Sequence, residues 1–284
     1  MIYVSTGGFG KQSAWQTVAD FHQAGISEIE LSGGKYDREN LSRLFQFKSI
    51  VAFQVHNYFP PPKVPFVFNL ASLDRDIAKQ SNRHVQKAMA CAVDLGRTIY
   101  SFHAGFLVDP KVDELGKNFG SQSLYDRKES IKAFIDRVHL LSEIAEKLGV
   151  ELLIENNVLS ATNFKSFSSN PFLMASADEC VSVMRDTPAN VNLLVDVAHL
   201  KVSANSLNFD PVDFLEQTNP WTMAYHLSDN DGLSDSNAPF TDDSWFWPYL
   251  KRNLNYYSVE VYNPSSMNIL KDQVALAKIN LNRE

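Results

Sequence analysis

Two patterns of apolar and polar residues alternate along the whole chain. Short apolar runs predict strands, and longer stretches with apolar residues every three or four positions predict helices between them. The predicted strands cover residues 2–5, 28–32, 50–56, 98–103, 151–156, 191–196, 223–227 and 256–261, and the helical period is clearest over 78–95, 128–148, 177–185 and 267–279. Eight strands that alternate with helices predict an α/β fold, a single (β/α)8 TIM-barrel domain over residues 1–284.

Polar residues that can bind a metal ion stand at the ends of several predicted strands. Four are in the second half of the chain and two in the first: Glu155, Asp196, His226 and Glu260, then His56 and His103. All strands of a parallel barrel point their carboxyl ends at one face, so these side chains are expected to meet there. One such residue alone is more often a hydrogen-bonded or solvated group. Six at equivalent places indicate a metal site, because buried carboxylates are costly unless paired or metal-bound.

Composition limits the classes of partner. The 284 residues have 44% hydrophobic content, which suits one large domain with a full core. A formal net charge of −7 argues against a broad basic face for nucleic acid, so no nucleic-acid partner is expected. Cys91 and Cys180 form no metal-type pair and are expected to be reduced, which suits a cytoplasmic protein. No signal peptide and no apolar stretch of membrane-spanning length are found, so no membrane partner is expected.

Long segments follow several strands, at about 57–75, 104–126, 157–177 and 228–243. They are expected to be loops around the barrel mouth, since long loops in compact domains are usually functional. The glycine-rich segment Gly7-Gly8-Phe9-Gly10 lacks the spacing of a dinucleotide-binding loop and is expected to be another mouth loop. Lys165 and Lys201 lie on mouth segments and could meet a phosphate, so phosphorylation of the substrate is left open.

The strand-end motifs resemble those of the xylose-isomerase-like TIM-barrel superfamily, which includes sugar isomerases, sugar epimerases and apurinic endonucleases. The resemblance rests on Ile154-Glu155-Asn156, Val195-Asp196-Val197-Ala198-His199, Tyr225-His226-Leu227-Ser228-Asp229-Asn230-Asp231-Gly232 and Val259-Glu260. It implies that Glu155, Asp196, His226 and Glu260 bind one divalent ion. It also implies that His199 contacts the substrate or a second metal ion.

The endonuclease branch of this superfamily implies more metal ions than the isomerase branch. There, His56 and His103 would bind a further ion, and an Asp-x-His pair would complete a third site. This chain has Asp235-Ser236-Asn237 at that place, and asparagine is a poor zinc ligand beside histidine. The substitution weakens the interpretation as a three-metal nuclease.

Three carboxylates and one imidazole suit Mn²⁺, Mg²⁺ or Co²⁺ at least as well as Zn²⁺, so the metal identity is left open. The expected activity is a metal-dependent isomerase or epimerase of a small sugar or sugar derivative, through a metal-stabilised enediolate. Glu155 and Glu260 are the expected catalytic bases on the two faces of the substrate. His56, His103 and His199 are the expected substrate-binding residues, with second-metal binding or structural hydrogen bonding as alternatives for His56 and His103.

Several other functions are compatible with the same residues. The nearest alternative is a metal-dependent dehydratase of a keto-polyol or related compound, because loss of a proton beside a carbonyl can also expel a hydroxyl. An abasic-site endonuclease and a catalytically silent sugar-binding protein are further alternatives, since fold alone does not decide function. The expected partner is a small carbohydrate. The natural sugar, the stereocentre and the oligomeric state, a homo-oligomer included, are left open.

Overall fold

A computed structural model describes residues 1–114 and 123–283 of the chain. Eight parallel strands pair in sequence order, and the last pairs with the first, which closes the barrel. The strands are β1 (Ile2–Ser5), β2 (Glu28–Leu31), β3 (Ala52–His56), β4 (Ile99–His103), β5 (Glu151–Glu155), β6 (Val191–Asp196), β7 (Thr222–Leu227) and β8 (Tyr256–Val259). The predicted (β/α)8 TIM barrel is confirmed.

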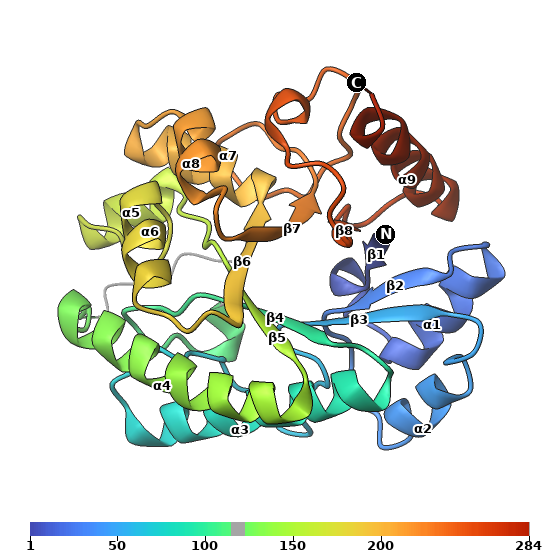
Figure 1. Ribbon diagram of the computed structural model, residues 1–284, viewed down its shortest axis with the longest axis horizontal. Helices are drawn as coiled ribbons and strands as arrows, with labels where there is room; N and C mark the ends of the chain where they lie inside the picture. The colour runs from blue at the N-terminus through green and yellow to red at the C-terminus, as the bar shows by residue number, and fades with distance from the viewer. Residues whose placement is uncertain (115–122, 284) are drawn as a thin grey trace.

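Helices surround the strands, as Figure 1 shows. They are α1 (Ala14–Gln23), α2 (Asn40–Phe45), α3 (Arg75–Asp94), α4 (Arg127–Leu148), α5 (Ala161–Phe167), α6 (Ala177–Arg185), α7 (Val197–Leu207), α8 (Pro211–Thr218) and α9 (Met267–Leu281). Short 3₁₀ turns occur at Gly7–Phe9, Val112–Glu114 and Trp247–Tyr249. Among the described residues, no helix is long and apolar enough to span a membrane.

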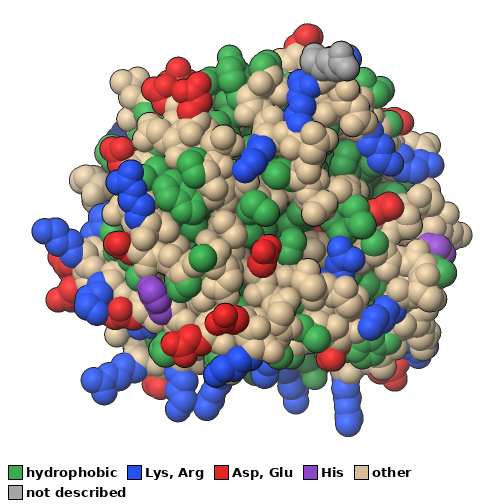
Figure 2. Space-filling view, viewed as in Figure 1, with side chains coloured by type: hydrophobic (Ala, Val, Ile, Leu, Met, Phe, Trp, Pro, Cys, Tyr) green, Lys and Arg blue, Asp and Glu red, His purple; other side chains and the backbone are tan. Residues whose placement is uncertain are grey.

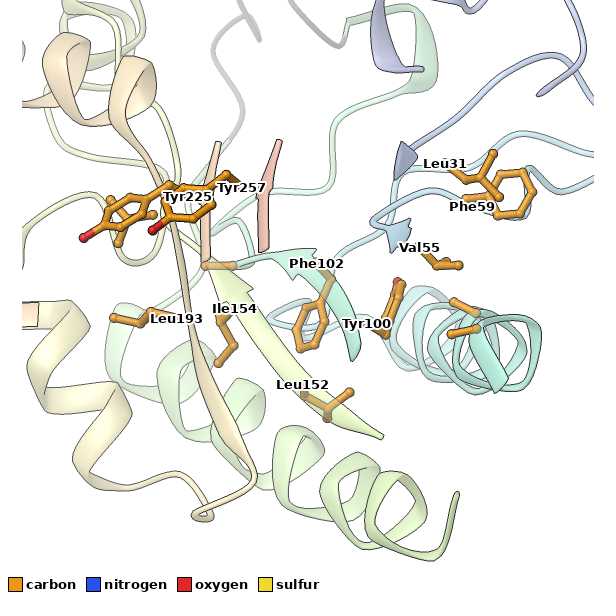
Figure 3. Packing of buried hydrophobic residues seen from close by; sticks show 14 of the residues in the cluster. Leu31, Val55, Phe59, Tyr100, Phe102, Leu152, Ile154, Leu193, Tyr225 and Tyr257 are labelled. Carbon is orange, nitrogen blue, oxygen red and sulfur yellow. The ribbon is translucent and has the colours of Figure 1, made fainter. Parts of the chain in front are cut away.

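The two faces of each strand carry different side chains, because successive residues of a strand point to opposite sides. Outward-facing residues such as Leu152 and Ile154 pack between the strands and the helices (Figure 3). Inward-facing residues form a separate apolar cluster of Tyr3, Leu153, Leu194, Ala224 and Tyr256. Two residues beyond Leu153 and Leu194, toward the carboxyl ends of their strands, the same inward phase reaches Glu155 and Asp196. The barrel therefore has an apolar layer inside and a polar layer at its mouth.

The long segments at the mouth are more structured than predicted. The segment 157–177 contains helix α5, so the expectation of a loop was wrong there. Ser160 caps this helix, because its hydroxyl oxygen accepts from the backbone N–H of Asn163 at 3.2 Å. Part of the predicted loop 104–126, residues 115–122, lies outside the described residues.

The surface seen in Figure 2 mixes acidic and basic side chains, with Lys and Arg gathered along the lower edge, where α3 and α4 lie. Cys91 and Cys180 are both buried and unpaired, as predicted for reduced cysteines.

Candidate metal centre

The four strand-end side chains that the sequence predicts as metal ligands meet at the mouth of the barrel. Glu155, Asp196, His226 and Glu260 are all buried, and each offers one ligand atom within 4.8 Å of the others. Nδ1 of His226 lies 3.2 Å from Oε1 of Glu155 and 3.4 Å from Oε2 of Glu260. It lies 3.9 Å from Oδ2 of Asp196. The structure therefore brings together the predicted group, from the carboxyl ends of four different strands.

Several of these atoms have no hydrogen-bond partner in the described part of the chain. They are both carboxylate oxygens of Glu155, Oδ2 of Asp196 and Nδ1 of His226. Buried polar atoms are normally hydrogen-bonded, because desolvation without a partner costs free energy. A divalent cation between them would satisfy all three side chains at once. The donor set of carboxylate oxygens and one imidazole nitrogen fits such an ion.

Asp196 divides its two oxygens between the fold and the candidate site. Oδ1 caps helix α7 by accepting from the backbone N–H of His199 at 2.7 Å. Asn156 holds the Asp196 backbone on both sides: its Oδ1 accepts from the Asp196 N–H at 2.8 Å, and its Nδ2 donates to the Asp196 carbonyl at 3.1 Å. These contacts leave Oδ2 directed into the cluster.

Glu260 follows β8 and is oriented in a similar way. Its Oε1 accepts hydrogen bonds from the Ser5 hydroxyl at 3.2 Å and the Tyr262 hydroxyl at 3.0 Å, while Oε2 faces His226. The glycine-rich segment makes this possible, because a Cβ on Gly7 would lie 2.3 Å from the Tyr262 hydroxyl oxygen. The absence of a side chain at Gly7 therefore lets the Tyr262 hydroxyl pack closely beside the site.

Glu155 faces additional histidines with its other oxygen. Oε2 lies 3.3 Å from Nε2 of His56 and 3.3 Å from Nδ1 of His103. His56 is buried, and its Nδ1 is 2.9 Å from the Ser101 hydroxyl. The side chain of His103 is 27% exposed and borders a cavity of about 340 Å³ lined by aromatic and apolar side chains, Phe66 and Phe106 among them. Of these two histidines, His103 is therefore the one that a molecule in the mouth can reach.

His199 lies near the first oxygen of Glu155, with its Nδ1 3.4 Å from Oε1. Its Nδ1 is 3.0 Å from the Asn156 carbonyl oxygen, and its Nε2 is 3.2 Å from Oδ2 of Asp235. The described residues offer two further ligand groups, His56 with Glu155 and His226, and His103 with Glu155 and His199. Asp235 belongs to none of the ligand groups found in the described chain.

Glu30 is a residue of this site that sequence reasoning missed. It lies on β2 and is fully buried, and its Oε2 accepts from the Tyr256 hydroxyl at 2.5 Å and lies 3.0 Å from Nε2 of His226. A signal for it exists in the alternation of Glu28-Ile29-Glu30-Leu31, where the outward phase is apolar and the inward phase is acidic. The strand was predicted, but its phase was not used.

Burial and mutual charge shift several pKa values in the cluster. Burial raises the pKa of Asp196 to about 7, with the neighbouring carboxylates of Glu155, Asp235 and Glu260 adding to it against the opposing charge of His199. Burial alone would raise the pKa of Glu155, but three histidines outweigh it and hold that pKa well below its usual value. Burial is likewise outweighed at Glu30, where His226 lowers the pKa to about 2.

The pKa of His226 is raised well above its usual value, since carboxylates outweigh its burial. Without a metal ion, the cluster thus holds protons on His226 and, below about pH 7, on Asp196. A metal ion would displace them, because its ligands must be deprotonated.

Lys201, which could have met a substrate phosphate, is already engaged. Its Nζ donates to Oδ1 of Asp229 at 2.6 Å and to the Asn230 carbonyl at 2.5 Å. It therefore fastens the segment after β7 to helix α7.

Comparison with known proteins agrees with this fold. Residues 18–276 match the sequence pattern of the xylose isomerase-like TIM barrel family. The chain belongs to that family. A solved D-tagatose 3-epimerase-like protein superposes with a TM-score of 0.71 at 16% identity, covering 99% of both chains. An L-ribulose 3-epimerase superposes at 0.69 with 16% identity, covering 99% of this chain and 94% of the other.

The probable 3-DHS dehydratase AsbF from Bacillus anthracis superposes with a TM-score of 0.63 at 16% identity, covering 100% of both chains. Likeness at such low identity shows the shared fold and leaves the reaction to be argued from the site. A search of curated protein sequences found no match.

Proposed function

We propose that this protein is a divalent-metal-dependent isomerase or epimerase of a small sugar or sugar derivative. The observation that carries the proposal is the convergence of buried, unpartnered ligand atoms from Glu155, Asp196 and His226, with Glu260 beside them. The metal would be Mn²⁺, Mg²⁺, Co²⁺ or Zn²⁺, since the donor set accepts each of them. The structural likeness to sugar 3-epimerases supports the choice of reaction.

A divalent ion held by these four residues would polarise a substrate carbonyl and stabilise the negative charge that develops when the neighbouring carbon loses a proton. Glu155 and Glu260 come from β5 and from the residue after β8, on well-separated parts of the barrel wall. The two are proposed as an acid–base pair: one carboxylate takes the proton and keeps it, while the other, protonated at the start, gives a proton to the opposite face. Ser5 and Tyr262 hold Oε1 of Glu260 and so fix the direction of that carboxylate.

The histidines are proposed to orient the substrate. His103 borders the cavity at the mouth, and His199 lies between Asn156 and Asp235, where its ring is held by two contacts. His56 is buried behind Glu155 and bonded to Ser101, so a direct substrate contact is less accessible to it than to His103. Its assignment as a substrate-binding residue stays a prediction.

Proton exchange at a carbon beside a carbonyl tests the proposal. In deuterated water, a panel of ketoses, ketose phosphates and keto-polyols is incubated with the metal-loaded protein and followed by NMR. At least one compound should gain deuterium at that carbon, and only when metal is present. Glu155→Gln and Glu260→Gln should each slow the exchange by roughly 10²–10⁴-fold after metal is restored. Glu151→Gln, at the exposed start of β5, is the matched control and should exchange normally.

Other outcomes would change the assignment. A conjugated enone among the products would show the dehydratase instead. Absence of exchange across the panel, together with cleavage of an abasic DNA duplex, would overturn the isomerase proposal in favour of a nuclease. Full exchange by metal-loaded Glu260→Gln would exclude Glu260 as a base.

A further inference from the structure

A continuous chain of hydrogen bonds runs through the barrel interior beneath the candidate metal centre. Nδ1 of His56 lies 2.9 Å from the Ser101 hydroxyl, which lies 3.2 Å from the Tyr256 hydroxyl. Tyr256 donates to Oε2 of Glu30 at 2.5 Å, and the same oxygen lies 3.0 Å from Nε2 of His226. The chain thus connects two histidines on β3 and β7 through side chains of β4, β8 and β2.

The positions of the protons in this chain follow by elimination. Glu30 is a carboxylate and can only accept, so it takes hydrogen bonds from the Tyr256 hydroxyl and from Nε2–H of His226. Tyr256 has one proton and gives it to Glu30, so the Ser101 hydroxyl must donate to Tyr256. Ser101 then has only acceptor capacity left, and Nδ1 of His56 must carry the proton in that contact.

In its neutral form, which a metal ligand must adopt, each histidine therefore turns an unprotonated nitrogen toward Glu155. For His226 it is Nδ1, which lies 3.2 Å from Oε1 of Glu155. For His56 it is Nε2, which lies 3.3 Å from Oε2 of the same residue. A lone pair opposite a carboxylate oxygen is unfavourable by itself and favourable when a cation lies between them.

We propose that Glu30, Tyr256 and Ser101 are positioning residues that set the tautomers of His226 and His56. Each histidine then presents an unprotonated nitrogen to a metal ion, His226 in the four-residue group and His56 in the group that it forms with Glu155 and His226. The inference rests on the proposed metal centre and deepens it. Metal-binding histidines commonly donate their other ring N–H to a carboxylate, and loss of that partner typically weakens metal binding by about 10–100-fold.

A purely structural role explains the chain less well. The second oxygen of Glu30, Oε1, is buried without a hydrogen-bond partner in the described residues, so this carboxylate is incompletely satisfied by the protein. Well-packed apolar residues commonly replace buried charges at little or no cost in stability. The placement of Glu30 is accounted for by what it does to His226.

Zinc affinity provides the first test, measured by competition with a chromophoric chelator. Glu30→Gln and Tyr256→Phe should each weaken zinc binding by about 10–100-fold. Tyr3→Phe is the matched control: Tyr3 packs edge-on against Tyr256 in the same interior cluster, but its hydroxyl contacts Arg97 and Met1 rather than Glu30. It should bind zinc like the wild type. Circular dichroism establishes that each variant is folded.

Histidine tautomers provide the second test, read from ¹⁵N-labelled histidine spectra of the zinc-loaded protein. The wild type should show Nε2–H for His226 and Nδ1–H for His56. Ser101→Ala should alter only His56, Glu30→Gln chiefly His226, and Tyr256→Phe both. This pattern follows the order of the chain, and a general loosening of the core would not produce it.

The outcomes separate the two proposals. Zinc binding by the wild type, with unchanged affinity and unchanged histidine signals in Glu30→Gln and Tyr256→Phe, would overturn the positioning role and leave the metal centre standing. A wild-type protein that binds none of Zn²⁺, Mn²⁺, Mg²⁺ and Co²⁺ would overturn both. If Glu30→Gln does not fold, Tyr256→Phe and Ser101→Ala decide the question.

Discussion

At the scale of single residues, three of the four ligands of the candidate centre share one arrangement. Asp196, His226 and Glu260 each use one polar atom to bond to the protein and leave the other directed into the cluster. The bonded atom fixes the rotamer, so the remaining atom is already in place before a metal ion arrives. Such outer contacts determine affinity nearly as much as the ligands themselves.

Asp196→Asn separates the two tasks of this residue. Asparagine caps a helix about as well as aspartate, so α7 should remain intact. Metal affinity should fall by about 100-fold or more, since loss of a ligand should exceed the 10–100-fold cost of losing an outer contact. Isothermal titration with Mn²⁺ measures it. Asp126→Asn, which changes the cap of α4 in the same way, should leave the affinity unchanged. Equal Mn²⁺ affinities in the two variants would remove Asp196 from the ligand set.

At the scale of secondary-structure elements, the strands were largely readable from the sequence. Predicted and observed bounds agree at 2–5 and 191–196 and differ by one or two residues at the other strands. The ends of β5 and β6 therefore placed Glu155 and Asp196 correctly. A short apolar run between helix-like or turn-rich segments is a local signal, so it can be recognised in a single sequence.

Individual contacts between side chains far apart in the sequence could not be predicted from these local patterns. Glu30 meets His226 across 196 positions of sequence, and Ser5 meets Glu260 across 255. These pairs depend on how β1, β2 and β8 come together on closing the barrel, and no local period reports it. Helix α5 was missed for a different reason, since its seven residues are too short to show a helical period.

The first mouth segment gives a prediction at this scale. Gly7→Ala would place a Cβ 2.3 Å from the Tyr262 hydroxyl oxygen, whereas a Cβ on Gly10 would meet nothing within 4 Å. Gly7→Ala should therefore displace Tyr262 from Glu260 or destabilise the fold by about 1–3 kcal/mol, the usual cost of overpacking. The rate of deuterium exchange into the substrate measures the displacement of Tyr262, and chemical denaturation measures the loss of stability. Gly10→Ala is the control and should match the wild type. Wild-type stability and exchange rate in Gly7→Ala would show that the contact between Tyr262 and Glu260 does not depend on a glycine at position 7.

At the scale of the whole molecule, the barrel gathers charge inside while its surface remains mixed. Four carboxylates, those of Glu30, Glu155, Asp196 and Glu260, and the imidazole of His226 are buried at its mouth. Burying these groups together shifts their pKa values, downward for Glu155 and Glu30 and upward for Asp196. Those of Glu155 and Glu30 are lowered, so their stabilising contribution is present above about pH 4.3 and is lost only in stronger acid.

Asp196 has the opposite effect on the pH dependence of stability, and metal binding should reveal this effect. Its pKa of about 7 in the folded protein exceeds an unfolded value of about 3.9. In the metal-free protein, its stabilisation is full below about pH 4 and is lost as pH rises through 7. The raised pKa of His226 acts with the same sign at higher pH.

A metal ion binds Asp196 and His226 only in their deprotonated forms. It therefore offsets the stability that the metal-free protein loses as these two groups give up their protons at higher pH. The metal-induced rise in Tm should therefore be larger at pH 8 than at pH 6, with affinity falling up to about tenfold per proton displaced for each pH unit below the pKa. Calorimetric titration in buffers of different ionisation enthalpy should detect protons released on binding, more of them at pH 6 than at pH 8. Asp196→Asn should abolish the part of this difference that centres near pH 7. A metal effect on Tm that is the same at both pH values, with no proton release, would show that the ion binds elsewhere.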